Sequence, residues 1–363
     1  MTLSALDNAT TENFADRLLD ILNAGALSLM VSIGHRSGLF DAMAAMPPAD
    51  CEEIARCAGL DERYVREWLA AMVTGRIVTY HAGTETYYLP PAHAASLTRL
   101  SSPDNLAVMA QAVPFLGGLE DRILKCFKTG RGLTYDAYTP RFHQIMAEDS
   151  AQTVVAVLHE MILPLVPGLV ARLRRGIDVL DIGCGAGRAL IAMAEAFPLS
   201  RFFGYELCAE AVRQARMEIA DRRLSNISVM RQDAATMPDR GAYDLVTAFD
   251  AIHDQADPAG VLAKVHTALR EGGTFLMQDT AASSRLDRNL DHPAGPLLYA
   301  ISTMHCLPVS LGYGGPGLGA MWGREAARAM LAEAGFDKVS VRQLPHDMAN
   351  EFYVAPKLAA AND

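Results

Sequence analysis

Residues 179–188 read VLDIGCGAGR and place an aspartate and three glycines at the end of an apolar run. The pattern is D-x-G-x-G-x-G, formed by Asp181, Gly183, Gly185 and Gly187. Glycine lets the backbone approach a ligand closely, and a carboxylate accepts hydrogen bonds from polar or cationic groups. This turn is therefore the first candidate binding site in the chain.

The spacing of the glycines discriminates between ligands. The dinucleotide pattern G-x-G-x-x-G requires glycine where Arg188 stands, and no Gly-Lys-Ser/Thr follows as in a phosphate-binding P-loop. The pattern that remains suits the amino-acid part of S-adenosylmethionine (SAM), which carries no phosphate. A turn for NAD is the alternative.

Two carboxylates follow later apolar runs and support the same ligand. Glu206 ends RFFGYE, where an acidic residue can accept from ribose hydroxyls, and Asp233 follows ISVMRQ, where it can accept from an adenine amino group. Three such signals in this order favour SAM over a dinucleotide.

A histidine follows the next apolar run, in FDAIHDQADP at 249–258. The ordinary pKa of histidine, about 6.5, suits proton removal near neutrality, so His253 is a candidate general base. In the alternative interpretation His253 merely begins a helix that Asp254 caps. The residues alone leave both open.

These motifs resemble those of class I SAM-dependent methyltransferases, and the resemblance covers roughly residues 150–363. The His-Asp segment resembles that of small-molecule O-methyltransferases with an N-terminal winged helix, from plants and in bacterial two-domain relatives. The resemblance implies that His253 deprotonates an acceptor hydroxyl and that Asp279 orients its ring. The family's second orienting carboxylate has no match, because Met321 stands near its expected place.

The resemblance also implies a full set of SAM-binding residues. These are Asp181, Gly183, Cys184, Gly185, Gly187, Glu206, Leu207, Asp233, Ala234, Phe249 and Asp250.

The elements that position these residues alternate between strand and helix from about residue 176. Alternation at this spacing predicts an α/β fold, a doubly wound, Rossmann-like, seven-stranded methyltransferase sheet. After TFLMQDT the alternation lapses for some forty residues rich in Gly and Pro, which predicts an irregular binding loop or lid around residues 286–322.

Three segments are expected: a winged-helix-like dimerisation domain at 1–100, a helical connector at 101–175 that contributes to the substrate pocket, and the SAM-binding domain at 176–363. In the first, helices at 52–58 and 61–72 precede two strand-like runs, IVTYH and TYYLP. The stretch 51–100 holds five arginines and six acidic residues, a net charge of −1 (five minus six), and no lysine. DNA-binding surfaces are basic, so packing into a homodimer is favoured over nucleic-acid binding.

Composition points to a cytoplasmic protein. The net charge is −10, the six cysteines form no C-x-x-C pair, and no metal site is expected from Asp250, Asp254, Asp257 and Asp279. The N-terminus has no basic region before an apolar stretch, so no secretory signal is expected. The apolar stretch at 21–40 contains His35 and Arg36, and is expected to be too short and polar to span a membrane.

The favoured hypothesis is a SAM-dependent methyltransferase that acts on a small, aromatic or otherwise apolar acceptor. The alternatives are a SAM-sensing winged-helix transcriptional regulator, and an N- or C-methyltransferase on the same scaffold. The residues expected to enclose the acceptor are Phe115, Phe142, Tyr299, Met304, His305, Met321 and Trp322.

Overall fold

The computed structural model describes residues 11–138 and 140–359. It divides the chain into two compact units, Met1–Gly118 and Leu119–Asp363. The expected connector, residues 101–175, is divided between the two units. The division of the chain into three segments therefore stays a prediction. Residues 1–10, part of the segment in which no secretory signal is expected, lie outside the described residues.

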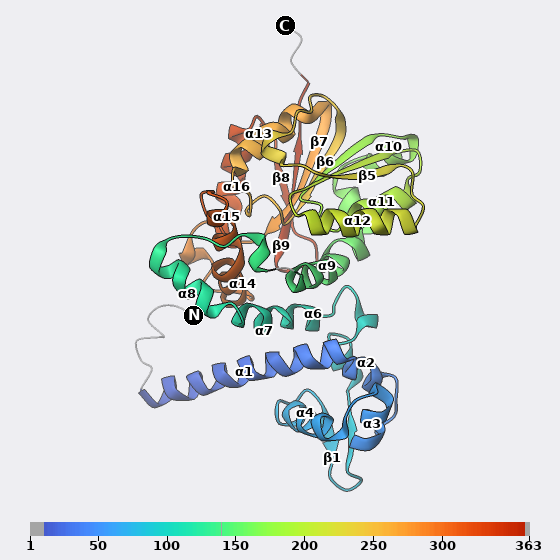
Figure 1. The fold of residues 1–363 in the computed structure, drawn as a ribbon, viewed down its shortest axis with the longest axis vertical. Coiled ribbons are helices and arrows are strands. Elements are labelled where there is room, and N and C mark those ends of the chain that lie inside the picture. Colours follow the sequence, from blue (N-terminus) through green and yellow to red (C-terminus); the bar gives the residue numbers. More distant parts are fainter. Residues whose placement is uncertain (1–10, 139, 360–363) are drawn as a thin grey trace. The chain divides into compact units, whose positions relative to one another are not determined.

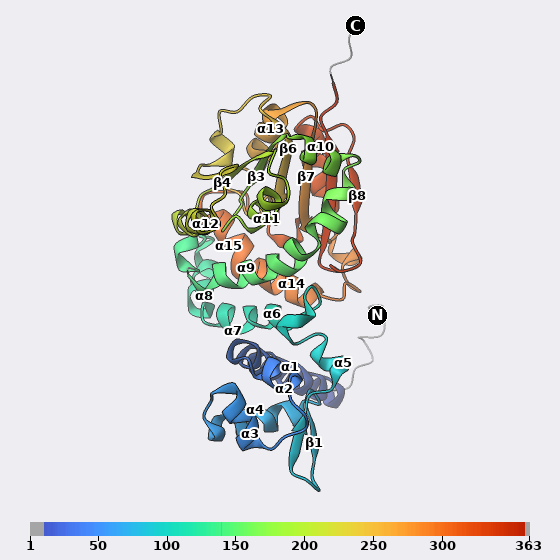
Figure 2. The same cartoon turned by 90° about the vertical axis from the view of Figure 1, so that its right-hand side faces the viewer.

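The first unit consists of short helices around one long helix, together with a hairpin (Figures 1 and 2). Its elements are α1 (Thr11–Ser37), α2 (Leu39–Ala44), α3 (Cys51–Ala58), α4 (Glu62–Thr74), β1 (Thr79–His81), β2 (Thr86–Tyr88), α5 (Pro91–Ala94), the 3-10 turn η2 (Arg99–Ser101), α6 (Ala107–Ala110) and α7 (Ala112–Gly117).

The predicted helix-turn-helix and hairpin are confirmed. Asp50 caps α3 by accepting from the Glu53 N–H, and α3 ends where Gly59 adopts a left-handed conformation. Asp61 caps α4, and β1 pairs antiparallel with β2.

Helix α1 carries large apolar side chains that are exposed. They are Phe14, Leu18, Leu19, Ile21, Leu22, Leu29 and Ile33. The helix is longer than the apolar stretch at 21–40 suggested, because it begins at Thr11 and continues through His35 and Arg36. Among the described residues, the helix Asn13–Ser37 is long and apolar enough to cross a membrane, by length and composition alone. Of its most apolar 18 residues, 17% are buried. The helices of Arg141–Leu165 and Leu169–Arg175 meet the same test only as a pair, bent by 106°.

The second unit is built on a seven-stranded sheet in the order β5-β4-β3-β6-β7-β9-β8. The strands are β3 (Asp178–Ile182), β4 (Arg201–Glu206), β5 (Ile227–Arg231), β6 (Tyr243–Phe249), β7 (Leu269–Thr280), β8 (Ser340–Arg342) and β9 (Asn350–Pro356). The strands from β5 to β7 pair in parallel as predicted, whereas β9 is antiparallel to its neighbours β7 and β8, so the sheet is mixed.

Helices cover both faces of this sheet, and a hydrophobic core lies on each face. The elements are α8 (Glu120–Thr129), η3 (Tyr135–Ala137), α9 (Arg141–Thr153), η4 (Val155–Val157), η5 (Leu158–Ile162), η6 (Leu163–Leu165), α10 (Leu169–Arg175), α11 (Arg188–Ala196), α12 (Ala209–Asp221), η7 (Ala234–Thr236), α13 (Pro258–Ala268), η8 (Leu286–Arg288), α14 (Gly295–Ile301), η9 (Ser302–Cys306), α15 (Leu307–Gly312), η10 (Ala320–Trp322) and α16 (Gly323–Glu333). Apolar residues of α13 and α16 pack on one face, and those of α10, α11 and α12 pack on the other (Figure 1).

The segment after β7 is mostly helical, so the prediction of an irregular loop at 286–322 is wrong. Pro296 and Pro308 stand in the first turns of α14 and α15. Proline is well tolerated at the start of α14, because the first N–H groups of a helix have no partner within it, and Pro308 directly follows the π turn η9. In both views α9, α14 and α15 lie at the same end of the sheet (Figures 1 and 2).

Phe275 offers a direct test of this core. Its side chain is fully buried in β7, with its ring centroid 5.9 Å from that of Phe336. Replacing Phe275 with Ala leaves a cavity, so we expect a loss of about 3–5 kcal/mol in the free energy of unfolding, measured by urea denaturation. Leu199, which is 69% exposed, is the control, and Leu199→Ala should change stability by no more than about 0.5 kcal/mol. Equal unfolding midpoints for the two variants would contradict the core assignment.

Candidate active site

The glycine-rich turn joins β3 to α11, as the sequence predicts. Gly183, Gly185 and Gly187 have φ angles of 66°, 53° and 73°, a left-handed conformation that favours glycine. A Cβ on Gly183 would lie 2.6 Å from the Ala251 Cβ, whereas the space beside Gly185 is open to at least 4 Å. The turn therefore presents bare backbone to open space at Gly185.

Two of the predicted carboxylates are held beside this turn. The Oε2 atom of Glu206 accepts from the Gly185 N–H at 2.9 Å, and its Oε1 accepts from the Cys208 N–H at 2.8 Å. Asp181 is 2% exposed and accepts from the Thr247 hydroxyl at 2.7 Å. Burial raises the pKa of Asp181 to about 7, against the effect of the Thr247 hydrogen bond. Burial also raises the pKa of Glu206.

The remaining predicted cofactor residues lie at the ends of the same strands. Asp233 follows β5 and accepts from the Ala235 N–H at 2.9 Å. Leu207 directly follows β4 and is 38% exposed, and Ala234 is buried. Asp250 directly follows β6 with a left-handed φ of 51°, and burial raises the pKa of its carboxyl well above the usual value. These two carboxylates and two apolar side chains thus border one edge of the sheet.

The last two predicted cofactor residues are Cys184, which lies within the glycine turn, and Phe249. Burial raises the pKa of the Cys184 thiol well above the usual value. Phe249 is the last residue of β6 and packs against the core that contains α11. The set therefore follows the carboxyl ends of β3, β4, β5 and β6, which are adjacent in the sheet.

His253 and Asp279 form a buried polar contact at the next strand ends. His253 lies in the loop after β6 and is 4% exposed, and Asp279 lies in β7 and is fully buried. The Nδ1 atom of His253 is 2.7 Å from the Asp279 Oδ1. Nδ1–H therefore donates to the carboxylate, and this bond sets the orientation of the ring. The contact matches the role that the family resemblance implies for Asp279.

Trp322 completes the surroundings of this carboxylate. Its Nε1–H donates to the Asp279 Oδ1 at 2.9 Å, and the Thr280 N–H donates to the same atom at 2.8 Å. Sequence reasoning looked for a second carboxylate near Met321. In the structure the residue beside Met321, Trp322, instead holds the Asp279 carboxylate through its indole N–H. No sequence pattern predicts this contact.

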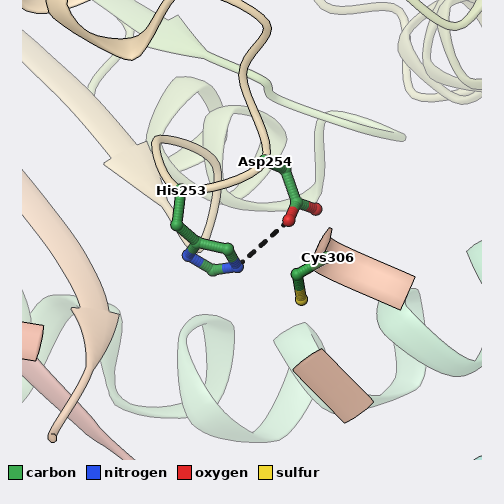
Figure 3. A group of neighbouring side chains, drawn as sticks. All are labelled: His253, Asp254 and Cys306. Atoms are coloured by element: carbon green, nitrogen blue, oxygen red, sulfur yellow. Dashed lines mark ion pairs between the residues drawn. The ribbon is translucent and has the colours of Figure 1, made fainter. Parts of the chain in front are cut away.

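Asp254 lies on the other side of the imidazole (Figure 3). Its Oδ1 is 3.2 Å from the His253 Nε2, in a geometry that leaves this oxygen without a hydrogen-bond partner. Burial lowers the pKa of His253, but Asp279 and Asp254 outweigh it and raise the pKa well above its usual value. The alternative in which Asp254 caps the next helix is wrong, because Asp257 caps α13 by accepting from the Gly260 N–H.

Aromatic side chains surround Asp254. The rings of His305 and Phe142 are stacked with centroids 3.9 Å apart, and the Tyr138 ring meets His305 edge-on at 4.7 Å. The Tyr135 hydroxyl donates to the Asp254 Oδ2 at 3.4 Å. Sequence reasoning named Phe142 and His305 but missed Tyr135 and Tyr138, which stand in the helical connector and belong to no motif.

The other residues expected to enclose the acceptor have different surroundings. The Tyr299 hydroxyl accepts from the Asn289 side chain at 3.0 Å, and Met321 packs with Leu298. The Met304 carbonyl accepts from the Tyr138 hydroxyl at 2.8 Å. Phe115 belongs to the first unit, so it has no assigned position relative to this site.

Comparison with known proteins assigns both parts of the chain to described domain families. Residues 25–99 match the Rv2258c-like winged HTH domain, and residues 173–305 match a methyltransferase domain. The structure of human N-acetylserotonin methyltransferase in complex with SAM is similar, with a TM-score of 0.68 and 17% identity, covering 97% of this chain and 100% of that one. An O-methyltransferase family protein from Burkholderia thailandensis gives a TM-score of 0.67 at 15% identity and covers 95% of this chain and 98% of that one.

Curated relatives match a shorter part of the chain. The nocamycin O-methyltransferase of Saccharothrix syringae is 29% identical over 184 residues, which is 48% of this chain and 64% of that protein. The chain spans less than two thirds of the length of the curated relatives it matches. This chain combines a winged helix-turn-helix domain with a methyltransferase domain.

Proposed function

We propose that this protein is a SAM-dependent methyltransferase that transfers a methyl group to a hydroxyl of a small-molecule acceptor. The observation that carries the proposal is the buried His253–Asp279 pair, which follows the strand next to the glycine turn in a domain that matches methyltransferases.

The residues of the turn fit SAM as the cofactor. Removal from water raises the pKa values of the Asp181, Glu206 and Asp250 carboxyl groups, and a cationic ligand would stabilise their ionised forms. SAM carries such positive charge on its sulfonium and ammonium groups. Asp181 would accept from the ammonium, Glu206 from the ribose hydroxyls, and the open backbone at Gly185 would lie against the amino-acid part.

His253 acts as the general base in this proposal. When bound, SAM supplies an electrophilic methyl group, and the chain holds the acceptor oxygen in line with it. Because Nδ1–H of His253 donates to Asp279, Nε2 is the atom that removes the hydroxyl proton. The stacked rings of His305 and Phe142 favour an aromatic or otherwise apolar acceptor.

The surface of the winged helix-turn-helix domain supports no nucleic-acid partner. On α4, the second helix of this motif, Arg63 pairs with Glu67 and Arg66 pairs with Glu62, so acidic side chains lie beside the basic ones on this helix, whereas DNA-binding surfaces are basic. We therefore propose a small-molecule acceptor. From the six cysteines, which form no C-x-x-C pair, we also propose a reducing, cytoplasmic location.

The domain is proposed instead to form a homodimer. Several large apolar side chains of α1 are exposed, and burial of such a surface against a second copy removes it from water.

Cofactor binding is tested by a matched pair of glycine variants. Gly185 and Gly241 have the same φ of 53° and equally open surroundings, but only Gly185 lies in the turn. By calorimetry we expect the wild type to bind SAM and not NAD, Gly185→Val to lose SAM binding, and Gly241→Val to retain it. A folded Gly185→Val protein that binds SAM as the wild type does would refute the assignment.

The base is tested by kinetics once a substrate panel has supplied an acceptor. We expect His253→Ala to leave SAM affinity unchanged and to slow methylation by about 100- to 10,000-fold, the usual range for general-base loss. The exposed His81, changed to Ala, is the control and should keep the wild-type rate.

The pH profile gives a second readout of the same group. Only the neutral imidazole accepts a proton, and the carboxylates of Asp279 and Asp254 raise the pKa of His253 despite its burial. The wild-type rate should therefore rise with pH through a midpoint above about 6.5. Asp254→Asn removes one of these charges and should move the midpoint to lower pH. An unchanged midpoint, or a His253→Ala rate near that of the wild type, would exclude His253 as the base.

The dimer is tested by light scattering of the full chain. Leu19 and Leu22 are 58% and 62% exposed on α1, and the double variant Leu19→Glu, Leu22→Glu should convert a dimer into a monomer. Met217, which is 60% exposed on α12, is the matched control, and Met217→Glu should remain dimeric. A monomeric wild type that sediments with lipid vesicles would show that α1 binds a membrane surface instead.

A further inference from the structure

We propose that the side chains of His253, Asp254 and Cys306 form a binding site for a thiophilic divalent cation of the Zn²⁺ class. The proposal goes beyond the methyl transfer described above, because no part of that function requires a metal.

The three side chains bring together one nitrogen, one oxygen and one sulfur donor. Their ligand atoms lie within 4.8 Å of one another (Figure 3). Zn²⁺ binds imidazole nitrogen and carboxylate oxygen at about 2.0–2.2 Å and thiolate sulfur at about 2.3 Å. Donors around one tetrahedral ion are therefore about 3–4 Å apart.

The oxygen donor is in place beside the nitrogen donor. The side chain of Asp254 is 9% exposed, and its Oδ1 lies 3.2 Å from the His253 Nε2 without making a hydrogen bond. The carboxylate, the imidazole nitrogen and the Cys306 thiol therefore share one buried space, and a cation there would bind all three donors.

The nitrogen donor is oriented as in metal centres. Metal-bound histidines commonly donate their other ring N–H to a carboxylate, which fixes the ring and increases its basicity. His253 makes this contact through Nδ1 to Asp279, so Nε2 faces Asp254 and Cys306 (Figure 3).

The sulfur donor comes from a short π-helical turn. Cys306 is the last residue of η9, and it is buried and forms no disulfide. π-helical turns are rare in proteins, and many of them lie at functional sites. The preceding His305 is also turned toward the cluster, with its Nδ1 3.8 Å from the Asp254 Oδ2 and its Nε2 lacking a hydrogen-bond partner.

Cation binding and proton removal exclude each other at His253. The cation uses the lone pair of Nε2, the atom assigned above to accept the hydroxyl proton, and ligation by Cys306 releases the thiol proton to solvent. A bound cation therefore inhibits methylation in competition with the acceptor. This consequence rests on the proposed function, whereas binding itself does not.

The test is a titration of the metal-free full-length protein with Co²⁺, which takes the same ligands and gives a thiolate-to-metal absorption band. We expect one equivalent to bind with this band and Zn²⁺ to displace it. Cys306→Ser should abolish the band. Asp279→Asn should weaken Co²⁺ binding by about 10- to 100-fold, the usual effect of losing an outer-shell partner.

The matched control is Cys208→Ser. Cys208 is another cysteine beside a histidine, with its sulfur 4.0 Å from the His143 Nδ1, and this variant should keep the band. Binding of S-adenosylhomocysteine and the near-UV circular dichroism spectrum show whether each variant is folded. If Cys306→Ser does not fold, Asp254→Asn takes its place and should weaken Co²⁺ binding by more than about 100-fold, since it loses a direct ligand.

Three results would overturn the proposal: no thiolate band in the wild type, a band that survives in folded Cys306→Ser, or a band that disappears in folded Cys208→Ser. Methylation by the chelator-treated protein reports on the proposed function separately, because the base needs no metal. The two proposals can therefore fail independently.

Discussion

The hydrogen bond between His253 and Asp279 is the contact on which the rest of the site depends. It joins the loop after β6 to β7, two neighbouring parallel strands in register from Leu245↔Thr274 to Phe249↔Gln278. A buried carboxylate is stable only when it is well paired. One oxygen of Asp279 accepts from His253, Thr280 and Trp322, while its other oxygen is buried without a hydrogen-bond partner. The imidazole is consequently held in one orientation, with Nε2 facing the open side of the cluster.

The sequence was sufficient to predict the half of the site that depends on strand ends. Asp181, Glu206, Asp233 and His253 each follow an apolar run, and parallel strands bring such positions to one edge of a sheet. The glycine turn was predictable for the same local reason, since three left-handed positions in seven residues are rarely tolerated without glycine.

The other half of the site could not be predicted, because it depends on tertiary contacts with no local pattern. Tyr135 reaches Asp254 from 119 residues away in the sequence, and Trp322 reaches Asp279 across 43 residues. The glycines and prolines at 286–322 suggested a loop because both residues interrupt helices. In the structure the two prolines stand in the first turns of helices, and a π turn between those helices brings His305 and Cys306 to Asp254.

Close backbone packing holds Tyr135 over the cluster. The Leu133 N–H donates to the Pro308 carbonyl at 2.8 Å, and a Cβ on Gly132 would lie 2.0 Å from that same oxygen. The segment before Tyr135 is thus fixed against α15, so the Tyr135 hydroxyl donates to one oxygen of Asp254 while the other oxygen faces the His253 Nε2 at 3.2 Å. That oxygen and Nε2 are adjacent atoms in a buried space. A hydroxyl that gives up its proton satisfies Nε2 alone, whereas a cation satisfies both atoms. Under the two proposals, this difference would let the same atoms act as a base toward a bound hydroxyl and as ligands toward a bound cation.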